Sequence, residues 1–362
     1  MLARKAEGFT SPNPMVGAVV VREGEIVGKG YHHRAGEAHA EINALREAGD
    51  KAYGATLYVT LEPCNHHGRT PPCTEAILAS GITEVVYAVP DPNPPASGGG
   101  HRLREAGLAV ISHICHDEAY DLNRFFFHRI RTKRPYVIAK FASSLDGKIA
   151  TYEGHSQWIT GEAARERAHQ LRHAVDAIMV GTDTAITDNP RLTTRLPIKN
   201  PKHPLRILLD SRGRIPLDHK LFSPDLPGET LVATTDAMPK EHEQQLREQG
   251  TDVLRLPANG WKQVNLEALL DALGTRNLQS LMVEGGAQLL GALFDADLID
   301  EVWAFIAPIL FGGGQDAPSA IGGFGIALVD DAPRLKNMHI ERLGDDILIR
   351  GQLKLSVAER DR

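Results

Sequence analysis

The chain lacks the features that mark membrane and secreted proteins. None of its 362 residues belongs to an uninterrupted apolar run near the ~18 residues that a membrane helix requires. Its three cysteines are too few, and odd in number, for a disulfide framework, which favours a reducing compartment. Residues 1–10 carry no apolar stretch of a secretory signal. We therefore expect a cytoplasmic protein with no membrane association.

The chain also has only a small net charge and few aromatic side chains. The formal net charge is −6, and aromatic residues make up 6% of the chain. Binding along a nucleic-acid backbone requires a basic field, commonly interleaved with aromatic side chains on which bases stack. The composition therefore favours a small-molecule substrate and argues against a nucleic-acid partner.

The length and the pattern of apolar residues predict two α/β domains. The chain is longer than the ~250–300 residues at which one hydrophobic core stops growing. Apolar, strand-like runs alternate with amphipathic, helix-like stretches in both halves. A polar, helix-like stretch at 117–131 ends in a basic run before Pro135. We place the boundary there and predict domains of residues 1–133 and 134–362.

Two local predictions concern the end of the first domain. Residues 90–100, with the sequence PDPNPPASGGG, are too rich in proline and glycine for regular structure and should form a loop. Cys115 continues a strand-like run, so we expect it in the core rather than at a metal.

Four residues of the first domain form the pattern of a catalytic metal site. His39 and Glu41 begin a helix-like stretch, and Cys64 and Cys73 bound a loop that follows a strand-like run. One imidazole and two thiolates leave a fourth position open, which is the composition of a catalytic zinc site. We expect one Zn²⁺ per chain on His39, Cys64 and Cys73. A helix that begins at Cys73 should help to keep its sulfur ionised.

Glu41 is the expected proton shuttle of this site. Zinc lowers the pKa of a bound water to about 7, so hydroxide is available near neutral pH. In zinc deaminases a glutamate takes that proton, passes it to a ring nitrogen and protonates the departing ammonia. Residues two apart on a regular helix point to nearly opposite sides, so His39 should lie at the helix entrance. The alternatives are a structural zinc site with His66 or His67 as fourth ligand, or simply three unrelated buried residues.

Polar residues around the expected metal are candidates for substrate binding. His66 and Arg69 lie between the two cysteines and are suited to a phosphate or a ring substituent; a solvated loop is the alternative. Asn13 stands between two prolines before the first strand. It is either a hydrogen-bond donor to a pyrimidine or a turn residue.

The second domain carries weaker local signals. Gly161 precedes one helix-like stretch, and the sequence Glu284-Gly-Gly joins a buried strand to another. Free N–H groups at such junctions bind phosphate, although ordinary capping and packing explain many of them. Arg172, Arg191 and Arg195 suit a substrate phosphate or, alternatively, a solvated surface. From these residues alone we predict a nucleotide-binding α/β domain.

Taken together, these motifs resemble one family. SPNPMVGA (11–18), HAE (39–41), TLEPC (60–64) and GRTPPC (68–73) resemble the deaminase half of the bacterial bifunctional riboflavin-biosynthesis deaminase/reductases. SLDGKIA, SQWITG, DNPRLTTR and VEGGAQLL resemble the reductase half, over residues 135 to about 355. The resemblance implies a cytidine-deaminase-like three-layer domain followed by a dihydrofolate-reductase-like domain that uses NADPH.

The same resemblance implies the reactions and the residues. The expected reactions are deamination of a diaminohydroxyphosphoribosylaminopyrimidine and NADPH-dependent reduction of the ribosyl group to ribityl. Matching motifs assign the cofactor to Ala142, Trp158, Thr184, Asp188, Ser211 and Gly286. They assign the substrate to Ser156, Arg172, Leu192, Arg195 and Glu284.

The enzyme is expected to be a homo-oligomer, either a dimer or a tetramer. Two other classes of protein compete with this interpretation. One is a tRNA-type nucleic-acid deaminase with an accessory nucleotide-binding domain, and it requires a basic groove. The other is a ligand-binding protein whose zinc is structural.

Overall fold

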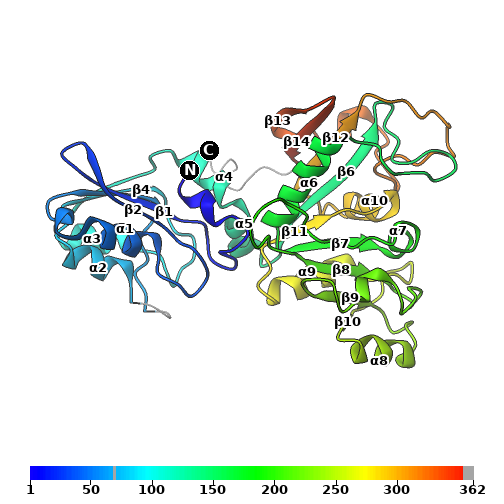
Figure 1. Ribbon diagram of the computed structural model, residues 1–362, viewed down its shortest axis with the longest axis horizontal. Coiled ribbons are helices and arrows are strands. Elements are labelled where there is room, and N and C mark those ends of the chain that lie inside the picture. The colour runs from blue at the N-terminus through cyan, green and yellow to red at the C-terminus, as the bar shows by residue number, and fades with distance from the viewer. Residues whose placement is uncertain (68–70, 354–362) are drawn as a thin grey trace. The chain divides into compact units, whose positions relative to one another are not determined.

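The computed structural model describes residues 1–67 and 71–353. Two compact units divide the chain, Met1–Lys133 and Arg134–Arg362, and each is built on its own sheet (Figure 1). The larger hydrophobic clusters lie within one unit or the other. In the described part of the chain, every helix is too short or too polar to cross a membrane.

The first unit contains a five-stranded sheet in the order β2-β1-β3-β4-β5. β1 is antiparallel to both of its neighbours, whereas β3, β4 and β5 run parallel. The strands are β1 (Gly17–Arg22), β2 (Glu25–Tyr31), β3 (Thr56–Leu61), β4 (Glu84–Val89) and β5 (Ala109–Ser112). The helices are α1 (Ala40–Ala48), α2 (Cys73–Ala79), α3 (Gly99–Glu105), α4 (His116–Leu122) and α5 (Arg124–Thr132).

Small residues set α1 close to the sheet and thereby place the metal-site histidine. A Cβ atom at Gly30 would lie 2.5 Å from the Ala40 carbonyl oxygen, and one at Gly28 would lie 2.3 Å from that of Ala44. Ala40 and Ala44 are fully buried in this contact. The helix therefore packs on β2 at a distance that only glycine permits, and its N-terminus is fixed beside the strand ends.

The end of the first unit differs from the sequence predictions at three points. The glycines of the 90–100 segment do not all lie in a loop, because α3 begins at Gly99, where a Cβ atom would overlap the Pro63 carbonyl oxygen. The polar 117–131 stretch is two helices, since the Asn123 side chain bonds both backbone groups of Met15 and interrupts it. Cys115 is exposed, not buried, in a left-handed cap before α4.

The second unit contains a nine-stranded sheet in the order β10-β9-β8-β7-β11-β6-β12-β14-β13. Neighbours from β10 to β12 are parallel, and the hairpin β13–β14 is added antiparallel at one edge. The strands are β6 (Tyr136–Ser144), β7 (Ala177–Gly181), β8 (Leu205–Leu209), β9 (Thr230–Thr234), β10 (Asp252–Arg255), β11 (Ser280–Val283), β12 (Glu301–Ala307), β13 (Lys336–Leu343) and β14 (Asp346–Gln352). The helices are α6 (Glu162–Ala174), α7 (Thr182–Asp188), α8 (Lys240–Glu248), α9 (Leu266–Thr275) and α10 (Ala287–Asp295).

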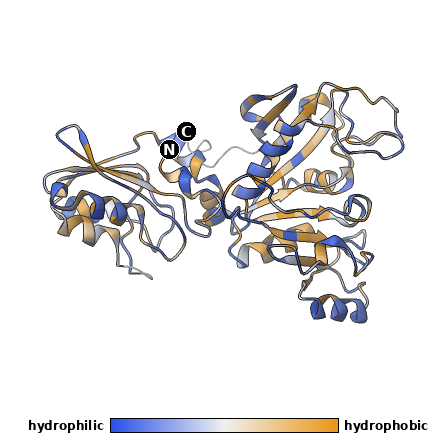
Figure 2. Cartoon of the chain, viewed as in Figure 1, coloured by the Kyte–Doolittle hydropathy of each residue, from blue (hydrophilic) through white to orange (hydrophobic). Residues whose placement is uncertain are grey.

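The central parallel strands of this sheet are apolar along their whole length. β7 and β11 read AIMVG and SLMV, and almost every residue in them is buried (Figure 2). Such continuous apolar runs are typical of parallel strands that are covered on both faces. In parallel sheets of this kind, ligands bind beyond the carboxyl ends of the strands. A second site is therefore expected among the polar residues that follow β6, β7, β8 and β11.

Candidate active sites

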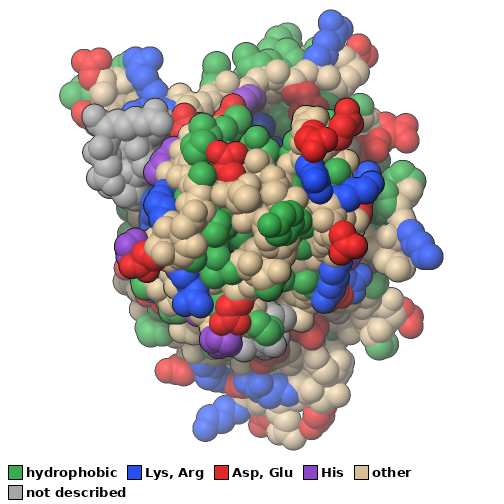
Figure 3. All heavy atoms as spheres, turned by 90° about the vertical axis from the view of Figure 1, so that its left-hand side faces the viewer, with side chains coloured by type: hydrophobic (Ala, Val, Ile, Leu, Met, Phe, Trp, Pro, Cys, Tyr) green, Lys and Arg blue, Asp and Glu red, His purple; other side chains and the backbone are tan. Residues whose placement is uncertain are grey.

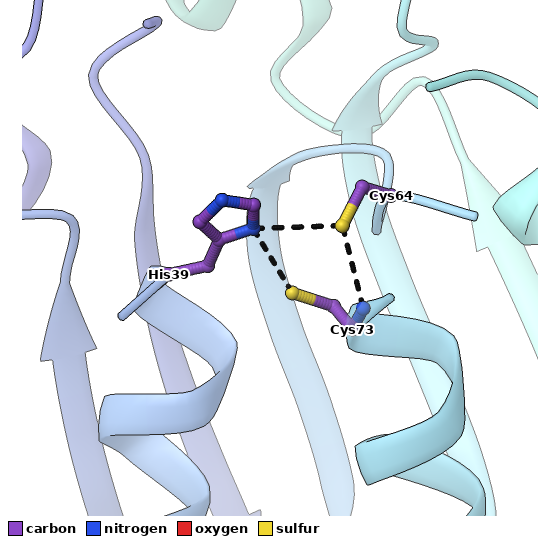
Figure 4. Close-up of side chains that lie close together, drawn as sticks. All are labelled: His39, Cys64 and Cys73. Carbon is purple, nitrogen blue, oxygen red and sulfur yellow. Dashed lines mark hydrogen bonds between the residues drawn. The ribbon is translucent and has the colours of Figure 1, made fainter. Parts of the chain in front are cut away.

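Three side chains of the first unit converge on one point (Figure 4). His39 comes from the entrance of α1, Cys73 from the first turn of α2, and Cys64 from the loop after β3. Their ligand atoms all lie within 4.8 Å of one another, with His39 Nδ1 3.2 Å from Cys73 Sγ and 3.5 Å from Cys64 Sγ. Ligands of a tetrahedral zinc ion lie about 3.6 Å apart, given its bond lengths. The donor set and its spacing both fit zinc.

The backbone at His39 explains how a histidine and a glutamate two residues apart serve one site. His39 has extended dihedral angles and is the N-cap of α1, whereas Glu41 lies within the helix. The prediction that His39 stands at the helix entrance is confirmed. Glu41 is buried and its carboxylate hydrogen-bonds the Cys73 thiol. The carboxylate therefore faces the metal-ligand cluster rather than the opposite side of the helix.

The two cysteines shift each other's pKa in opposite directions. A hydrogen bond with Cys73 lowers the pKa of Cys64 to about 4, while the same bond and burial raise the pKa of Cys73. The backbone N–H of Cys73 also donates to Cys64 Sγ at 3.3 Å. The start of α2 therefore stabilises the sulfur of Cys64.

Glu41 has the acidity of a proton shuttle. Burial raises the pKa of its carboxyl to about 7, with an opposing contribution from His39. A group whose pKa lies near the working pH both accepts and releases a proton readily.

The loop between the cysteines supplies no fourth ligand among its described residues. His67 is exposed and pairs with Glu75 at 3.2 Å, so it is engaged elsewhere. His66 Nδ1 is buried and has no hydrogen-bond partner in the described part of the chain. The cluster of possible ligands comprises His39, Cys64 and Cys73 alone in that part. Arg69, the other loop residue predicted to bind substrate, lies outside the described residues.

Asn13 reaches the metal-ligand cluster through a histidine that the sequence had not singled out. Its side-chain nitrogen lies 3.1 Å from His32 Nε2, and the other ring nitrogen of His32 lies 3.2 Å from the Ala38 carbonyl oxygen. The His32 ring packs edge-on against that of His39, with centroids 5.3 Å apart. His32 thus connects Asn13 to His39. The SPNP segment and the HAE segment were recognised separately, and only the fold shows this link.

Asp91, a carboxylate that was not predicted as a site residue, also lies near the cluster of metal ligands. Burial raises the pKa of Asp91 to about 6, and the negative charges of Glu62 and Cys64 add to the shift. Glu62 accepts hydrogen bonds from the backbone N–H groups of Asp91 and Gly100, at 3.0 and 2.9 Å. The buried Glu62 therefore fixes the 90–100 segment beside the cysteines. The only sequence signal for this arrangement was the glutamate of the TLEPC motif, Glu62.

In the second unit, the residues predicted to bind NADPH follow the carboxyl ends of four neighbouring strands. Ala142 lies near the end of β6, and Ser211 follows β8. Thr184 is in the first turn of α7, after β7, and its hydroxyl accepts from the Gly286 N–H at 3.0 Å. Gly286 is the N-cap of α10, after β11. Backbone N–H groups of that helix start are suited to the phosphates of a dinucleotide.

Two further predicted residues lie in the segments that surround these strand ends. Asp188 ends α7 and accepts a hydrogen bond from the Ser156 hydroxyl at 3.4 Å. Trp158 is 66% exposed, and the Arg165 guanidinium stacks over its ring at 4.9 Å. A large exposed ring beside a strand-end site is available to a planar ligand.

A charge network occupies the predicted substrate position. Glu284 accepts from Lys140 Nζ at 2.6 Å and from Arg172 Nη2 at 2.5 Å. These two cations hold the pKa of the Glu284 carboxyl well below its usual range, against the effect of burial. Arg172 also donates to the Thr193 carbonyl oxygen at 3.3 Å, beside the buried Leu192. Lys140 was not predicted as a site residue, although a lysine within an apolar strand was the available signal.

Arg195 is held by a histidine that the sequence analysis did not consider. Its Nε and its backbone N–H lie 3.2 and 3.3 Å from the two ring nitrogens of His169. Burial lowers the pKa of His169 to about 4, assisted by the positive charges of Arg172 and Arg195. The ring is therefore neutral at pH 7 and offers a lone pair to Arg195. His169 and Arg172 are three residues apart on α6, so they share one face of it.

Comparisons with known proteins cover both units. Residues 1–89 match the cytidine and deoxycytidylate deaminase zinc-binding region, and residues 135–349 match the RibD C-terminal domain. The riboflavin biosynthesis protein RibD of Actinobacillus pleuropneumoniae is 47% identical over 350 residues, which cover 96% of this chain and 92% of that protein. That of Escherichia coli strain K12 is 42% identical over 360 residues and 95% of its length.

Solved structures agree over nearly the whole length. RibD of Acinetobacter baumannii superimposes with a TM-score of 0.86 at 38% identity, covering 97% of this chain and 95% of that one. A diaminohydroxyphosphoribosylaminopyrimidine deaminase/5-amino-6-(5-phosphoribosylamino)uracil reductase of Thermotoga maritima gives 0.84 at 36% identity, with the same coverage. The chain belongs to the RibD family.

Membership in the RibD family confirms the predicted class of enzyme. The chain is a bifunctional riboflavin-biosynthesis enzyme, a deaminase and a reductase, with zinc and NADPH as its cofactors. Its first unit has the cytidine-deaminase-like fold and its second the dihydrofolate-reductase-like fold of RibD proteins. The tRNA-type deaminase considered above is disfavoured by these matches.

Proposed function

We propose that residues 1–133 deaminate a diaminohydroxyphosphoribosylaminopyrimidine and that residues 134–362 reduce the resulting 5-amino-6-(5-phosphoribosylamino)uracil. These are the two substrates named for the Thermotoga maritima protein. The proposed boundary is supported by the two compact units and by the two separate family matches. The observation that carries the proposal is the buried His39, Cys64 and Cys73 cluster with the Glu41 carboxylate against it.

In the deaminase site, we assign the metal to His39, Cys64 and Cys73 and proton transfer to Glu41. When bound, zinc activates a water for attack on the ring carbon that bears the amino group. Glu41, with its raised pKa, would take one proton from that water and deliver it to the ring nitrogen. A second proton, from the hydroxyl group then carried by the attacked carbon, would pass through Glu41 to the amino group, which leaves as ammonia. We assign substrate contacts to Asn13, His66 and Arg69. The unpartnered Nδ1 of His66 supports its part in this assignment.

In the reductase site, we assign NADPH to the strand-end residues and the ribosyl phosphate to the charge network. When bound, NADPH would supply a hydride to the anomeric carbon of the phosphoribosylamino group, whose ring-opened imine form is thereby reduced to the ribityl chain. Arg172 and Arg195 offer guanidinium N–H groups to the phosphate, and Glu284 keeps Arg172 in place. The proposed cofactor residues are Ala142, Trp158, Thr184, Asp188, Ser211 and Gly286. The proposed substrate residues are Ser156, Arg172, Leu192, Arg195 and Glu284.

The surface of the first unit supports a small-molecule substrate. On the face turned to the viewer in Figure 3, basic and acidic side chains are interspersed. A polyanion would favour a surface of one sign. We further propose that the enzyme acts in the cytoplasm, where its cysteines stay reduced, and that it assembles as a homo-oligomer.

The Glu41→Gln variant tests the deaminase assignment. Ammonia release from the diaminopyrimidine should fall at least about 100-fold, because the amide cannot shuttle a proton. The zinc content per chain and NADPH oxidation with the aminouracil substrate should be unchanged. Glu37→Gln, an exposed glutamate four residues earlier, is the matched control. A Glu41→Gln enzyme that releases ammonia within about threefold of the wild-type rate would refute the proposed role.

A further inference from the structure

The contact between His169 and Arg195 contains one hydrogen too many. His169 lies on α6 and is buried. Both of its ring nitrogens face donors of Arg195: Nδ1 lies 3.3 Å from the backbone nitrogen, and Nε2 lies 3.2 Å from the side-chain Nε. A neutral imidazole has one lone pair and one N–H, whereas an imidazolium has two N–H groups and no lone pair. The ring can therefore accept only one of these two hydrogen bonds.

The lone pair of the ring belongs with the backbone N–H of Arg195. A main-chain N–H is held in place by the fold, and leaving it without a partner is costly. The two residues before it, Thr193 and Thr194, are buried, so this stretch of backbone has little access to water. The Arg195 side chain belongs to an exposed residue and turns about several single bonds. The lone pair of His169 is therefore on Nδ1, and the ring hydrogen is on Nε2.

This tautomer directs two N–H groups at the same place. The Nε2–H of His169 and the Nε–H of Arg195 face each other, and neither has an acceptor within the part of the chain that the structure describes. The Arg195 guanidinium also has no carboxylate partner among those residues. One oxygen atom placed beside both groups could accept from each of them. The missing acceptor is therefore a ligand atom.

The charges around the pair indicate that this ligand is an anion. Burial lowers the pKa of Arg195, and the positive charges of Arg172 and Arg191 lower it further. The carboxylate of Glu284 opposes this effect, but it already accepts hydrogen bonds from both Lys140 and Arg172. Positive charge therefore remains in excess around Arg195. A phosphomonoester carries about −1.5 to −2 charges at pH 7 and offers three acceptor oxygens, which suits this environment.

We propose that His169 is a further ligand of the substrate phosphate in the reductase site. Its Nδ1 accepts from the Arg195 backbone, and its Nε2–H donates to the phosphate beside the Arg195 guanidinium. Arg172 lies three residues after His169 on α6 and shares its face of the helix. The proposal rests on the assignment of the ribosyl phosphate to Arg172 and Arg195. It adds a neutral, directional donor to a site that otherwise attracts phosphate by charge.

Two substitutions separate the roles of the two ring nitrogens. The amide of asparagine reaches the position of Nδ1, whereas the amide of glutamine reaches the position of Nε2. His169→Asn therefore keeps an acceptor for the backbone N–H and loses the donor to the phosphate, and His169→Gln does the reverse. The KM for the phosphorylated aminouracil should rise at least about 10-fold in His169→Asn and less than about threefold in His169→Gln. In both variants kcat should stay within about threefold of the wild type.

A readout independent of activity is the nitrogen NMR spectrum of the histidine rings in the zinc-loaded full chain. The signals of His169, identified by their loss in His169→Gln, should show hydrogen on Nε2 and none on Nδ1. The Nε2 signal should shift when the phosphorylated aminouracil is added without NADPH.

The matched control is His173→Gln. His173 lies on the same helix, and its Nδ1 accepts from the backbone N–H of Lys202 at 3.0 Å. The ring of His173 thus holds the backbone after Arg195, much as Nδ1 of His169 holds that of Arg195. Its loss should leave the KM for the phosphorylated aminouracil within about twofold of the wild type.

Three results would overturn the proposal. One is hydrogen on Nδ1 of His169, and another is a His169→Asn enzyme with the KM of the wild type. The third is a rise in KM in His169→Gln or His173→Gln as large as that in His169→Asn, which would make the role of His169 purely structural.

Arg195→Ala separates this inference from the proposed function. If Arg195→Ala leaves the KM for the phosphorylated aminouracil unchanged, the assignment of the phosphate to Arg195 is wrong, and the role of His169 is wrong with it. If Arg195→Ala raises this KM while His169→Asn does not, the phosphate assignment stands and only the role of His169 is wrong.

Discussion

Different kinds of force hold the side chains of the two candidate active sites in place. In the first unit, three metal ligands and Glu41 come from a stretch of 35 residues, and a bound zinc ion would fix their geometry. In the second unit, the network of Lys140, Arg172, Arg195 and Glu284 is assembled from β6, α6 and the segments after α7 and β11. That network is fixed by ion pairs and by the sheet itself.

The difference predicts different responses to mutation. Loss of a deaminase group should remove chemistry and leave the fold of its unit in place, provided that the metal remains. Loss of a reductase group should disturb stability as well, because a buried charge that loses its partner is costly. The three tryptophans, Trp158, Trp261 and Trp303, all lie in the second unit, so their fluorescence reports the unfolding of that unit.

Glu284→Gln should have the largest effect on stability. It leaves Lys140 and Arg172 without their shared counter-charge in a site where all three side chains are largely buried. We expect the free energy of unfolding of the second unit to fall by about 2–4 kcal/mol, measured by tryptophan fluorescence in urea. Ammonia release should not change.

The control for this prediction is an exposed ion pair of the same unit. Asp183 pairs with Arg214 at 2.7 Å, and both side chains are about half exposed or more. Asp183→Asn should cost less than about 1 kcal/mol. Equal losses in the two variants would show that the Glu284 network contributes no more than a surface pair.

His169→Gln should have a smaller, pH-dependent effect. In the unfolded chain, this histidine is protonated below about pH 6.5. In the folded chain, the pKa of His169 is lowered to about 4, so the ring stays neutral until the pH approaches that value. The unfolded state therefore binds more protons between these values, and the stability of the second unit should fall as the pH falls from about 6.5 to 4. The wild type should lose up to about 3 kcal/mol more than His169→Gln across this range. Parallel pH profiles for the two proteins would contradict the neutral, buried state of His169.

The contrast also explains what the sequence could and could not reveal. Metal ligands are few in type and specific in spacing, so His39, Cys64 and Cys73 were predicted from chemistry, and so was the position of His39 at a helix entrance. Lys140 and His169 were missed because each acts through a residue far away in the sequence. The proline- and glycine-rich composition of residues 90–100 also led to a wrong prediction of a loop at Gly99. This residue starts a helix, and a close backbone contact requires glycine there.

The Arg195→Ala variant, assayed for both reactions, tests the account most directly. Removing the guanidinium beside His169 should reduce kcat/KM for NADPH-dependent reduction of the aminouracil by about 10–100-fold, through loss of a charge-assisted contact to its phosphate. Ammonia release from the diaminopyrimidine should match the wild type. An Arg195→Ala enzyme that loses deamination but keeps NADPH oxidation would contradict the assignment of the two reactions to the two units.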